Sequence, residues 1–205
     1  MQQPDHPRPV EARLQVPKAA GPEPRPVTLR DGSRVTIRAM RPDDAPRLQA
    51  LFCRLSPESI FFRFLGQPRE LSDREARRLA TVDYGAQMAW VAVPERSPEG
   101  EGAEEQIIGV ARYARLPDKA GPEAQTQAIA EAAVVVEDRW QRQGLGTMLL
   151  QALADYARAH GIDAFQATVH QTNTRILRFI RRSGLPTHDK VEGGLWEIRV
   201  SLEED

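Results

Sequence analysis

A polar turn between an apolar run and an amphipathic segment carries the clearest chemistry in this chain. The run 131–136 ends in three consecutive valines and predicts a buried strand, and residues 147–160 have the apolar spacing of a helix. The first turn of a helix offers unpaired backbone N–H groups and a partial positive charge. Gly144 and Gly146 let a ligand approach the backbone, and Arg142 adds positive charge beside them. The turn therefore predicts a phosphate or pyrophosphate site.

The spacing of the glycines separates the known kinds of phosphate loop. A Walker loop needs Lys-Ser or Lys-Thr after its last glycine, and here Thr147-Met148 follows Gly146. A Rossmann fingerprint needs a third glycine where this chain has Leu149. The remaining pattern, Gln141-x-x-Gly144-x-Gly146 after a strand and opening a helix, resembles the acyl-CoA pyrophosphate loop of the GNAT N-acetyltransferase superfamily. The alternative is a strand–helix turn that binds no ligand.

The order of predicted elements agrees with this resemblance from about Val27 to Ser201. The fold class is α/β (α+β), with strands and helices mixed along one domain. The resemblance implies a GNAT fold: a mixed, mostly antiparallel twisted sheet of about six to seven strands with four to five helices, splayed at the acyl-CoA site. The predicted elements are a hairpin over 27–38, helices over 41–55, 57–64, 73–82, 147–160 and 173–183, and strands over 88–93, 106–113, 131–136, 164–169, 187–191 and 195–201.

Composition sets the remaining bounds. Residues 1–26 hold seven prolines and predict a disordered N-terminal tail, which leaves 27–205 as the domain. The net charge of −1 argues against a nucleic-acid partner, and no apolar run is long enough for a membrane span. A lone cysteine, Cys53, is interpreted as a core residue in a reducing compartment, so we expect a cytoplasmic protein. The four histidines lack the spacing of metal ligands, and no metal is expected.

The first half of the domain narrows the resemblance. Its motifs are similar to the acetyltransferase domain of bacterial Pat-type protein lysine acetyltransferases, and the similarity covers nearly the whole domain. It implies a protein partner with an acceptor lysine. For the chain itself we expect a monomer or homodimer. The motifs are Leu29-Arg-Asp-Gly32, Ile37-Arg38, Arg41-Pro42-Asp43, Leu55-Ser-Pro-Glu-Ser59, Phe62-Arg-Phe64 and Val82-Asp-Tyr84.

The resemblance also implies which residues bind acetyl-CoA as co-substrate. Backbone groups of the strand would hydrogen-bond the pantetheine arm, and the loop amides would hold the pyrophosphate. Asn173, at the start of the helix after the next strand, matches an asparagine of the family and would support the acyl-CoA arm. The full set of expected binding residues is Val134, Val135, Val136, Gln141, Arg142, Gln143, Gly144, Leu145, Gly146, Thr147 and Asn173.

Catalysis requires a base, because a lysine ammonium with a pKa of about 10.4 must lose a proton before it attacks a thioester. In Pat-type enzymes the proposed base is a glutamate ten residues before the loop glutamine. Ten residues before Gln141 stands Glu131, the one carboxylate within the valine strand. The tyrosine that serves many GNAT enzymes as general acid is replaced by Ile180, a departure that Pat-type members share.

Three functions remain open from the sequence. The first is transfer of acetyl from acetyl-CoA to a lysine side chain of a protein, by direct attack in a ternary complex. The second is transfer to a small-molecule amine. The third is a catalytically weak acyl-CoA-binding sensor module, which the absence of the tyrosine permits. These functions differ in the acceptor, which the sequence leaves unnamed.

Overall fold

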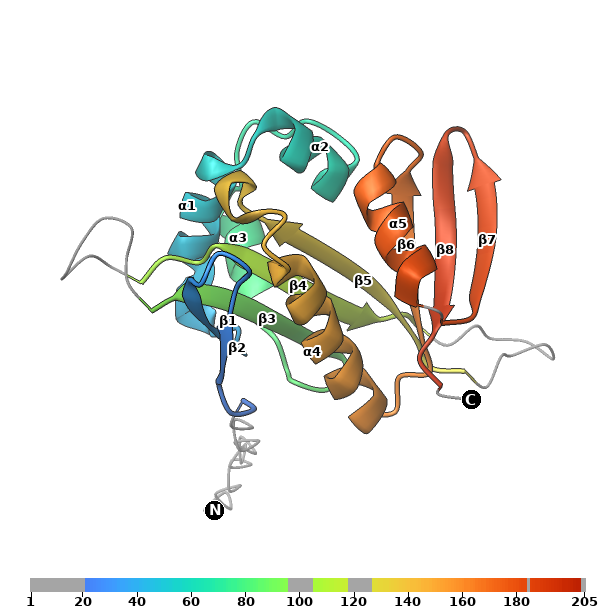
Figure 1. The fold of residues 1–205 in the computed structure, drawn as a ribbon, viewed down its shortest axis with the longest axis horizontal. Coiled ribbons are helices and arrows are strands. Elements are labelled where there is room, and N and C mark those ends of the chain that lie inside the picture. Colours follow the sequence, from blue (N-terminus) through green and yellow to red (C-terminus); the bar gives the residue numbers. More distant parts are fainter. Residues whose placement is uncertain (1–20, 96–104, 118–126, 184, 204–205) are drawn as a thin grey trace, which may run out of the picture.

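The computed structural model describes residues 21–95, 105–117, 127–183 and 185–203. In this part of the chain eight strands form one twisted sheet in the order β1-β2-β3-β4-β5-β6-β8-β7 (Figure 1). Neighbours are antiparallel except β5 and β6, which run parallel, so the mixed, mostly antiparallel sheet is confirmed. The strands are β1 (Arg25–Thr28), β2 (Arg34–Ala39), β3 (Gln87–Pro94), β4 (Gly109–Arg115), β5 (Ile129–Val136), β6 (Ala164–His170), β7 (Thr187–Glu192) and β8 (Leu195–Ser201).

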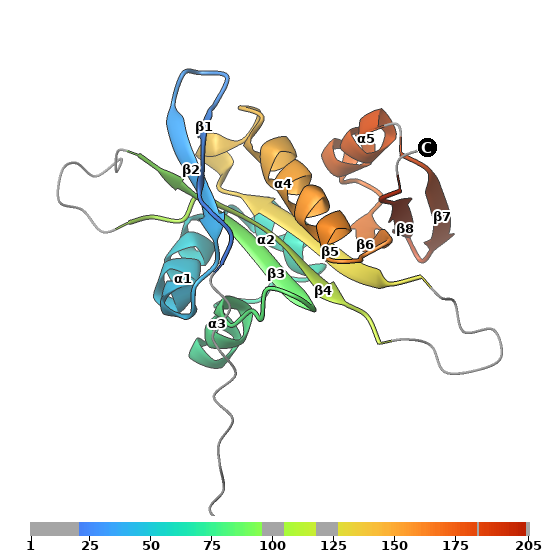
Figure 2. The same cartoon turned by 90° about the horizontal axis from the view of Figure 1, so that it is seen from below.

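The strand count exceeds the expected six to seven because both arms of the first hairpin join the sheet. Helices cover its two faces: α1, α2 and α3 lie on one side, and α4 and α5 on the other (Figure 2). The described residues also contain two 3-10 turns, η1 and η2. The bounds are η1 (Pro42–Asp44), α1 (Ala45–Arg54), α2 (Pro57–Phe64), α3 (Asp73–Ala80), η2 (Asp138–Trp140), α4 (Leu145–Ala159) and α5 (Thr174–Ser183).

Two apolar cores hold the helices against the sheet. One lies under α4 and contains Trp90, Tyr113 and Leu149, all fully buried. The other lies under α1 and α3 and includes Leu51 and Val91. Consecutive strand residues point to opposite faces, so the neighbours Trp90 and Val91 of β3 serve different cores. The central strands β3 and β4 are therefore apolar on both faces, which explains their continuous apolar runs.

The sheet begins slightly before the expected domain boundary. Strand β1 starts at Arg25, two residues before Val27. Gly21 is also packed on the domain, because a Cβ built there would lie 3.0 Å from the Cβ of Ala39 and 3.2 Å from the Tyr84 ring. Residues 1–20, most of the predicted tail, lie outside the described residues. The tail as a disordered segment thus stays a prediction.

The interpretation of Cys53 as a core residue was wrong. The buried face of α1 is formed by Ala45, Leu48, Leu51 and Phe52, and Cys53 is exposed. One helical step of 100° beyond Phe52 turns the thiol away from the core. Apolar neighbours in sequence therefore misled the assignment, because helical phase decides burial. None of the helices in the described ranges is long and apolar enough to span a membrane.

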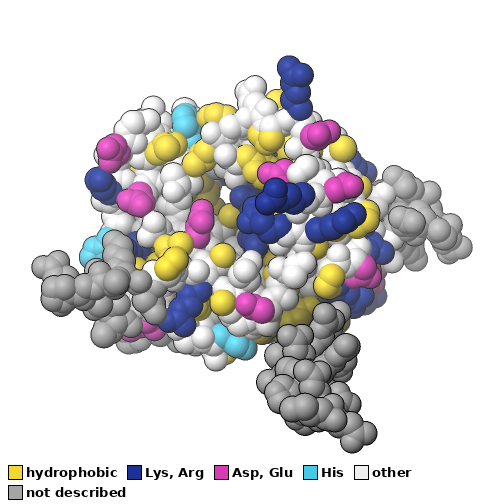
Figure 3. Space-filling model, turned by 180° about the vertical axis from the view of Figure 1, so that it is seen from behind, with side chains coloured by type: hydrophobic (Ala, Val, Ile, Leu, Met, Phe, Trp, Pro, Cys, Tyr) yellow, Lys and Arg dark blue, Asp and Glu magenta, His cyan; other side chains and the backbone are white. Residues whose placement is uncertain are grey.

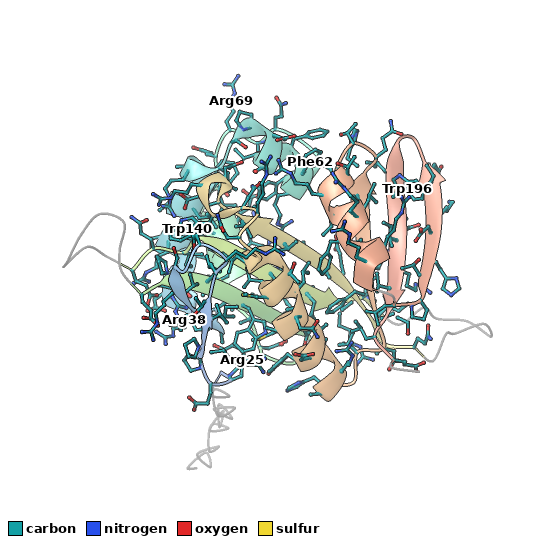
Figure 4. All side chains as sticks on the ribbon, viewed as in Figure 1. Arg25, Arg38, Phe62, Arg69, Trp140 and Trp196 are labelled. Atoms are coloured by element: carbon teal, nitrogen blue, oxygen red, sulfur yellow. The ribbon has the colours of Figure 1, made fainter. Side chains whose placement is uncertain are left out.

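A buried ion pair joins the first hairpin to the helical side. Both terminal nitrogens of Arg38, which is labelled in Figure 4, donate to the two carboxylate oxygens of Asp44 at 2.8 Å. Asp44 is fully buried. The backbone N–H of Arg41 donates to the same carboxylate at 2.8 Å, and Glu105 also pairs with Arg38. Burial opposes the charge of Arg38, but the hydrogen bonds and charges of Asp44 and Glu105 outweigh it and raise the arginine pKa.

This pair generates a stability prediction. Asp44→Ala leaves a buried guanidinium without its main partner, so the free energy of unfolding should fall by about 3–5 kcal/mol. The neighbouring Asp43 is exposed, and Asp43→Ala should change stability by at most about 0.5 kcal/mol. Urea denaturation of the two variants measures the difference. Equal midpoints would show that the buried pair contributes nothing.

Candidate active site

The sheet splits in the middle of β5. On one side β5 pairs with β4 over residues 130–136, but on the other it pairs with β6 over 129–131 alone. Beyond Glu131 the two parallel strands diverge, and the gap between them is visible in the ribbon (Figure 1). Residues 132–136 of β5 are therefore paired along one edge and open along the other. The splay that the sequence led us to expect at the acyl-CoA site is present.

The peptide groups that face the gap follow from the hydrogen-bond pattern. On the β4 side Leu116 donates to the carbonyl of Ile129 at 2.8 Å, and on the β6 side Asp163 donates to that of Ala128, also at 2.8 Å. Backbone groups alternate sides along a strand, so even-numbered residues of β5 point to β6 and then to the gap. Val134 and Val136 thus direct their backbone toward the gap, whereas that of Val135 faces β4.

The turn after β5 has the geometry of an anion site. Gly144 is the N-cap of α4 at φ +91°, and no side chain caps the helix. The first helical bond runs from the Met148 N–H to the Gly144 carbonyl at 3.1 Å. The N–H groups of Leu145, Gly146 and Thr147 precede that bond and have no helical partner. Leu145 is 1% exposed as a whole residue and belongs to the core under α4, so Gly146 and Thr147 form the accessible part of this turn.

Two arginines supply charge beside this turn. Arg142 is exposed and holds a left-handed φ of +63°, which is uncommon for a residue with a side chain. The second, Arg30, comes from the first hairpin, and its backbone N–H donates to the backbone carbonyl of Gln143 at 3.2 Å. A Cβ built on Gly144 would lie 3.8 Å from the Arg30 Nε. Free amides, an uncapped helix and two cations fit a pyrophosphate.

The Gln141 side chain stabilises the loop through hydrogen bonds to three other elements. Its side-chain nitrogen donates to the Val136 carbonyl at 3.0 Å and to the Ser59 hydroxyl of α2 at 3.1 Å. Its side-chain oxygen accepts from Arg175 at the start of α5. These three contacts join β5, α2 and α5 across the open end of the gap. The sequence predicted Gln141 as a ligand-binding residue; its side chain supports the loop, and its contact with a ligand stays a prediction.

The two acids that follow β5 are turned away from the loop amides. Glu137 is 3% exposed and pairs with Arg54 and Arg139. Asp138 accepts from the N–H and hydroxyl of Ser56 at 2.8 and 2.7 Å, and from the Ser59 hydroxyl at 2.9 Å. Burial would raise the pKa of Asp138, but these hydrogen bonds outweigh burial and lower it. Neither carboxylate competes with an anion for the loop.

The predicted base lies at the other end of β5. Glu131 is exposed and is the last β5 residue paired with β6, opposite Gln166. It lies on the sheet face that carries α2, because its charge acts on Arg63 of α2 and on Arg112 of β4. From Glu131 to Val136 the strand rises about 17 Å, at ~3.3 Å per residue. A ligand with a pyrophosphate at one end and a reactive group at the end of a long arm matches this separation.

The structure gives Asn173 a local role. Its side-chain oxygen accepts from the Ile176 N–H at 3.4 Å, a helix-capping contact at the start of α5. The same turn carries Arg175, so Asn173 lies on the β6 side of the gap near the loop. Its contribution to an acyl-CoA arm stays a prediction. Ile180, at the position of the family tyrosine, is partly buried on α5.

The comparison with protein families decides the assignment. The family model described as "Acetyltransferase (GNAT) family" matches residues 60–185, which include the split strand, the loop and α5. This chain belongs to the GNAT acetyltransferase family. The predicted fold and family are therefore confirmed.

Known proteins resemble this acetyltransferase over part of their length. An acetyltransferase of Pseudomonas aeruginosa is 36% identical over 134 residues, 65% of either chain. Acetyltransferase Pat of Mycolicibacterium smegmatis is 30% identical over 161 residues, 78% of this chain and 44% of that protein. The chain thus spans less than two thirds of each of these relatives.

Solved structures show the same fold. The GNAT domain of S. lividans PAT superposes with a TM-score of 0.72 at 26% identity, covering 87% of this chain and 96% of that one. A cAMP-binding acyltransferase from Mycobacterium smegmatis gives a TM-score of 0.55 at 25% identity, covering 89% and 48%. The match to the isolated GNAT domain is nearly complete on both sides.

The loop geometry yields a prediction with an internal control. Gly144 and Gly161 lie near the two ends of α4, and both have positive φ, +91° and +72°. Alanine at either position should lower the free energy of unfolding by about 1 kcal/mol, because a Cβ is strained in this conformation. Gly144→Ala alone should also weaken acetyl-CoA binding, by about tenfold, since the loop amides shift. Isothermal calorimetry reads the affinities, and equal affinities in both variants would exclude the loop as the binding site.

Proposed function

We propose that this domain transfers acetyl from acetyl-CoA to the side-chain amine of a lysine in a protein substrate. The observation that carries the proposal is the position of Glu131, where the pairing of β5 and β6 ends. There an exposed carboxylate adjoins the gap that receives the acyl-CoA arm and the open face beyond it. The similarity to Acetyltransferase Pat and to the GNAT domain of S. lividans PAT supports a Pat-like activity.

The face next to Glu131 favours a large acceptor. Strands β6, β8 and β7 carry α5 on one side, and Figure 2 shows no helix on the other. The covered side is apolar, with Phe165, Val169 and Ile198 buried. The uncovered side, here called the polar face, carries Gln166, Thr168, His188, Lys190 and Glu197. Small-molecule sites are usually concave and enclosed, so an open polar surface supports a protein acceptor.

The residues then divide the chemistry between the two ends of β5. Arg30, Arg142 and the amides of 144–147 would hold the pyrophosphate. The Val134 N–H points into the gap and would donate to the thioester oxygen as negative charge develops there. Glu131, directly or through a water, would take the proton from the acceptor ammonium. Free amine then attacks the thioester carbon, the carbon–sulfur bond breaks, and CoA leaves as thiolate. The acetylated nitrogen loses its second proton to water, which leaves a neutral amide.

Protonation of the leaving thiolate needs no side chain at position 180. Ile180 carries no exchangeable proton, and the open gap gives water access to the sulfur. A CoA thiol is acidic enough for water to serve. We further propose that the protein is cytoplasmic, where acetyl-CoA and protein acceptors occur together, and that it is a monomer or homodimer. In the described residues there is no group of three or more potential metal ligands.

One experiment separates this function from the two alternatives. The protein is incubated with acetyl-CoA and a cell lysate, and acetyl-lysines are mapped by mass spectrometry against a reaction without the protein. Enrichment at defined lysines supports the proposal. Acetylated small amines without protein modification would indicate the small-molecule enzyme. Acetyl-CoA binding without any turnover would indicate a sensor module.

Glu131→Gln tests the proposed base. The change keeps the size of the side chain and removes the proton acceptor, so kcat should fall by about 10²–10³-fold at pH 7 while acetyl-CoA affinity is unchanged. Raising the pH should restore part of the rate, because more acceptor amine is then neutral. Glu58, exposed on α2, supplies a matched control, and Glu58→Gln should keep the wild-type rate.

Steady-state kinetics on one acceptor protein, from pH 6.5 to 9.5, measure both variants. A Glu131→Gln rate within threefold of wild type at pH 7 would remove Glu131 from the mechanism. A parallel loss in Glu58→Gln would indicate that the effect is not specific to the end of the β5–β6 pairing.

A further inference from the structure

Three arginines gather around Glu131 on the α2 side of the sheet. Arg112 of β4 is paired with Ala133, which lies two residues after Glu131 in β5. Because alternate residues of a strand share a face, Arg112 and Glu131 lie on the same face of the sheet. The Arg112 side chain reaches α3, where its Nη1 donates to the carbonyl of Leu79 at 3.4 Å. The second arginine, Arg78, directly precedes Leu79 on α3. The third, Arg63, comes from α2, which packs on β5. Seen from behind, basic side chains gather beside a hollow of this face (Figure 3).

The charges of this cluster are not balanced. Among the described residues, neither Arg63 nor Arg78 makes a hydrogen bond or an ion pair; Arg63 lies beside the Phe64 ring, with its guanidinium carbon 5.2 Å from the ring centre. Burial lowers the pKa of Arg63, Glu131 opposes this, and Arg78 adds to it. Burial and the charges of Arg63 and Arg78 lower the pKa of Arg112 to about 10. Within the described ranges, Glu131 is the one carboxylate of this cluster on the sheet, and the exposed Glu75 of α3 also acts on Arg78, so three cations face two carboxylates and the net charge is about +1.

A further carboxylate would relieve this imbalance. The acceptor amine has to reach Glu131, and an ammonium that approaches three guanidinium groups alone is repelled. An acceptor that brings its own carboxylate offsets this repulsion and gives the partly buried Arg63 a partner. Arginine is suited to this task because its planar fork binds a carboxylate through two parallel hydrogen bonds.

We propose that Arg63 and Arg78 bind a carboxylate that the acceptor carries beside the reacting amine, so that preferred acceptors are lysines flanked by aspartate or glutamate. This specificity rests on the proposed lysine acetyltransferase function. Arg112 is 9% exposed and already bonded to Leu79 and Gln87, so it adds positive charge to the cluster without binding the carboxylate itself. Glu131 remains free to accept the proton, because the carboxylate of the acceptor, and not Glu131, pairs with Arg63 and Arg78.

The test compares three matched peptides, each with one lysine flanked by glutamate, glutamine or arginine. Their kcat/KM values are measured at saturating acetyl-CoA. Wild type should prefer the glutamate peptide over the glutamine peptide by at least about tenfold, the range of a charge-assisted hydrogen bond. Arg63→Gln and Arg78→Gln should each reduce that preference severalfold. Arg78→Glu should move the preference to the arginine peptide.

Matched controls lie on the same elements. Arg77 is exposed one residue before Arg78 on α3, and Arg69, after α2, points away from the domain (Figure 4). Arg77→Gln and Arg69→Gln should keep the wild-type order of the three peptides. Thermal denaturation of every variant checks folding, and the exposed Arg78 keeps the test valid if the partly buried Arg63→Gln proves unstable.

Several outcomes would overturn the carboxylate site. These are equal kcat/KM values for the three peptides, or an acidic preference that survives Arg78→Glu. A selectivity for succinyl-CoA over acetyl-CoA that disappears in Arg63→Gln would place the carboxylate on the acyl donor and would also reject the assignment to the acceptor.

A binding measurement keeps this inference separate from the proposed function. If no lysine peptide is acetylated although acetyl-CoA binds, the lysine acetyltransferase assignment fails. Calorimetric binding of a lysine-free glutamate peptide to the protein–CoA complex then tests the arginines directly. Binding that is lost in Arg78→Glu supports the carboxylate site, and equal binding by wild type and Arg78→Glu refutes it.

Discussion

The end of the β5–β6 pairing at Glu131 is the constraint on which the rest of the site depends. Three residue pairs hold the parallel strands together, and the five residues that follow in β5 are paired with a neighbouring strand, β4, on one side only. Because β5 continues straight to the turn before α4, one rigid strand fixes both the carboxylate and the anion loop. Their separation is set by the rise of a β-strand. A flexible loop would not fix the distance between the two ends of a long ligand in this way.

The loop itself is supported from three directions. Asp138 binds Ser56, the N-cap residue of α2, Gln141 bonds to β5, α2 and α5, and Arg30 approaches from the first hairpin. The side chains of Asp138 and Gln141 are held by protein groups, whereas the Arg30 side chain lies beside Gly144 at the start of α4. The carboxylates are consumed by hydroxyls and arginines, so the amides at the start of α4 are left for an anion. The protein thereby separates structural from ligand-facing polar groups within a ten-residue stretch.

The sequence predicted what local patterns determine. Alternation and helical spacing located the elements, the capping box at Ser72 marked the start of α3, and the glycine after α4 has the expected positive φ. The glycine spacing of the loop identified the family. Contacts across long sequence separations were missed, because Arg30 meets Gly144 and Ser59 meets Gln141 only through tertiary packing. Neither Arg63 nor Arg78 carries a local signal, since their importance comes from sharing a sheet face with Glu131.

The short pairing of β5 and β6 also has a mechanical consequence. The bonds that anchor the C-terminal part of the sheet cluster at the closed end, where Asp163 binds Ala128 and Leu202. At the open end the two halves meet through Arg175 on Gln141 and the His170 ring against Phe61, 5.1 Å apart. A relative motion of the two halves would therefore pivot about the closed end, where the backbone hydrogen bonds are concentrated. A long ligand that entered from the side would then have to break these two side-chain contacts to separate the strands further.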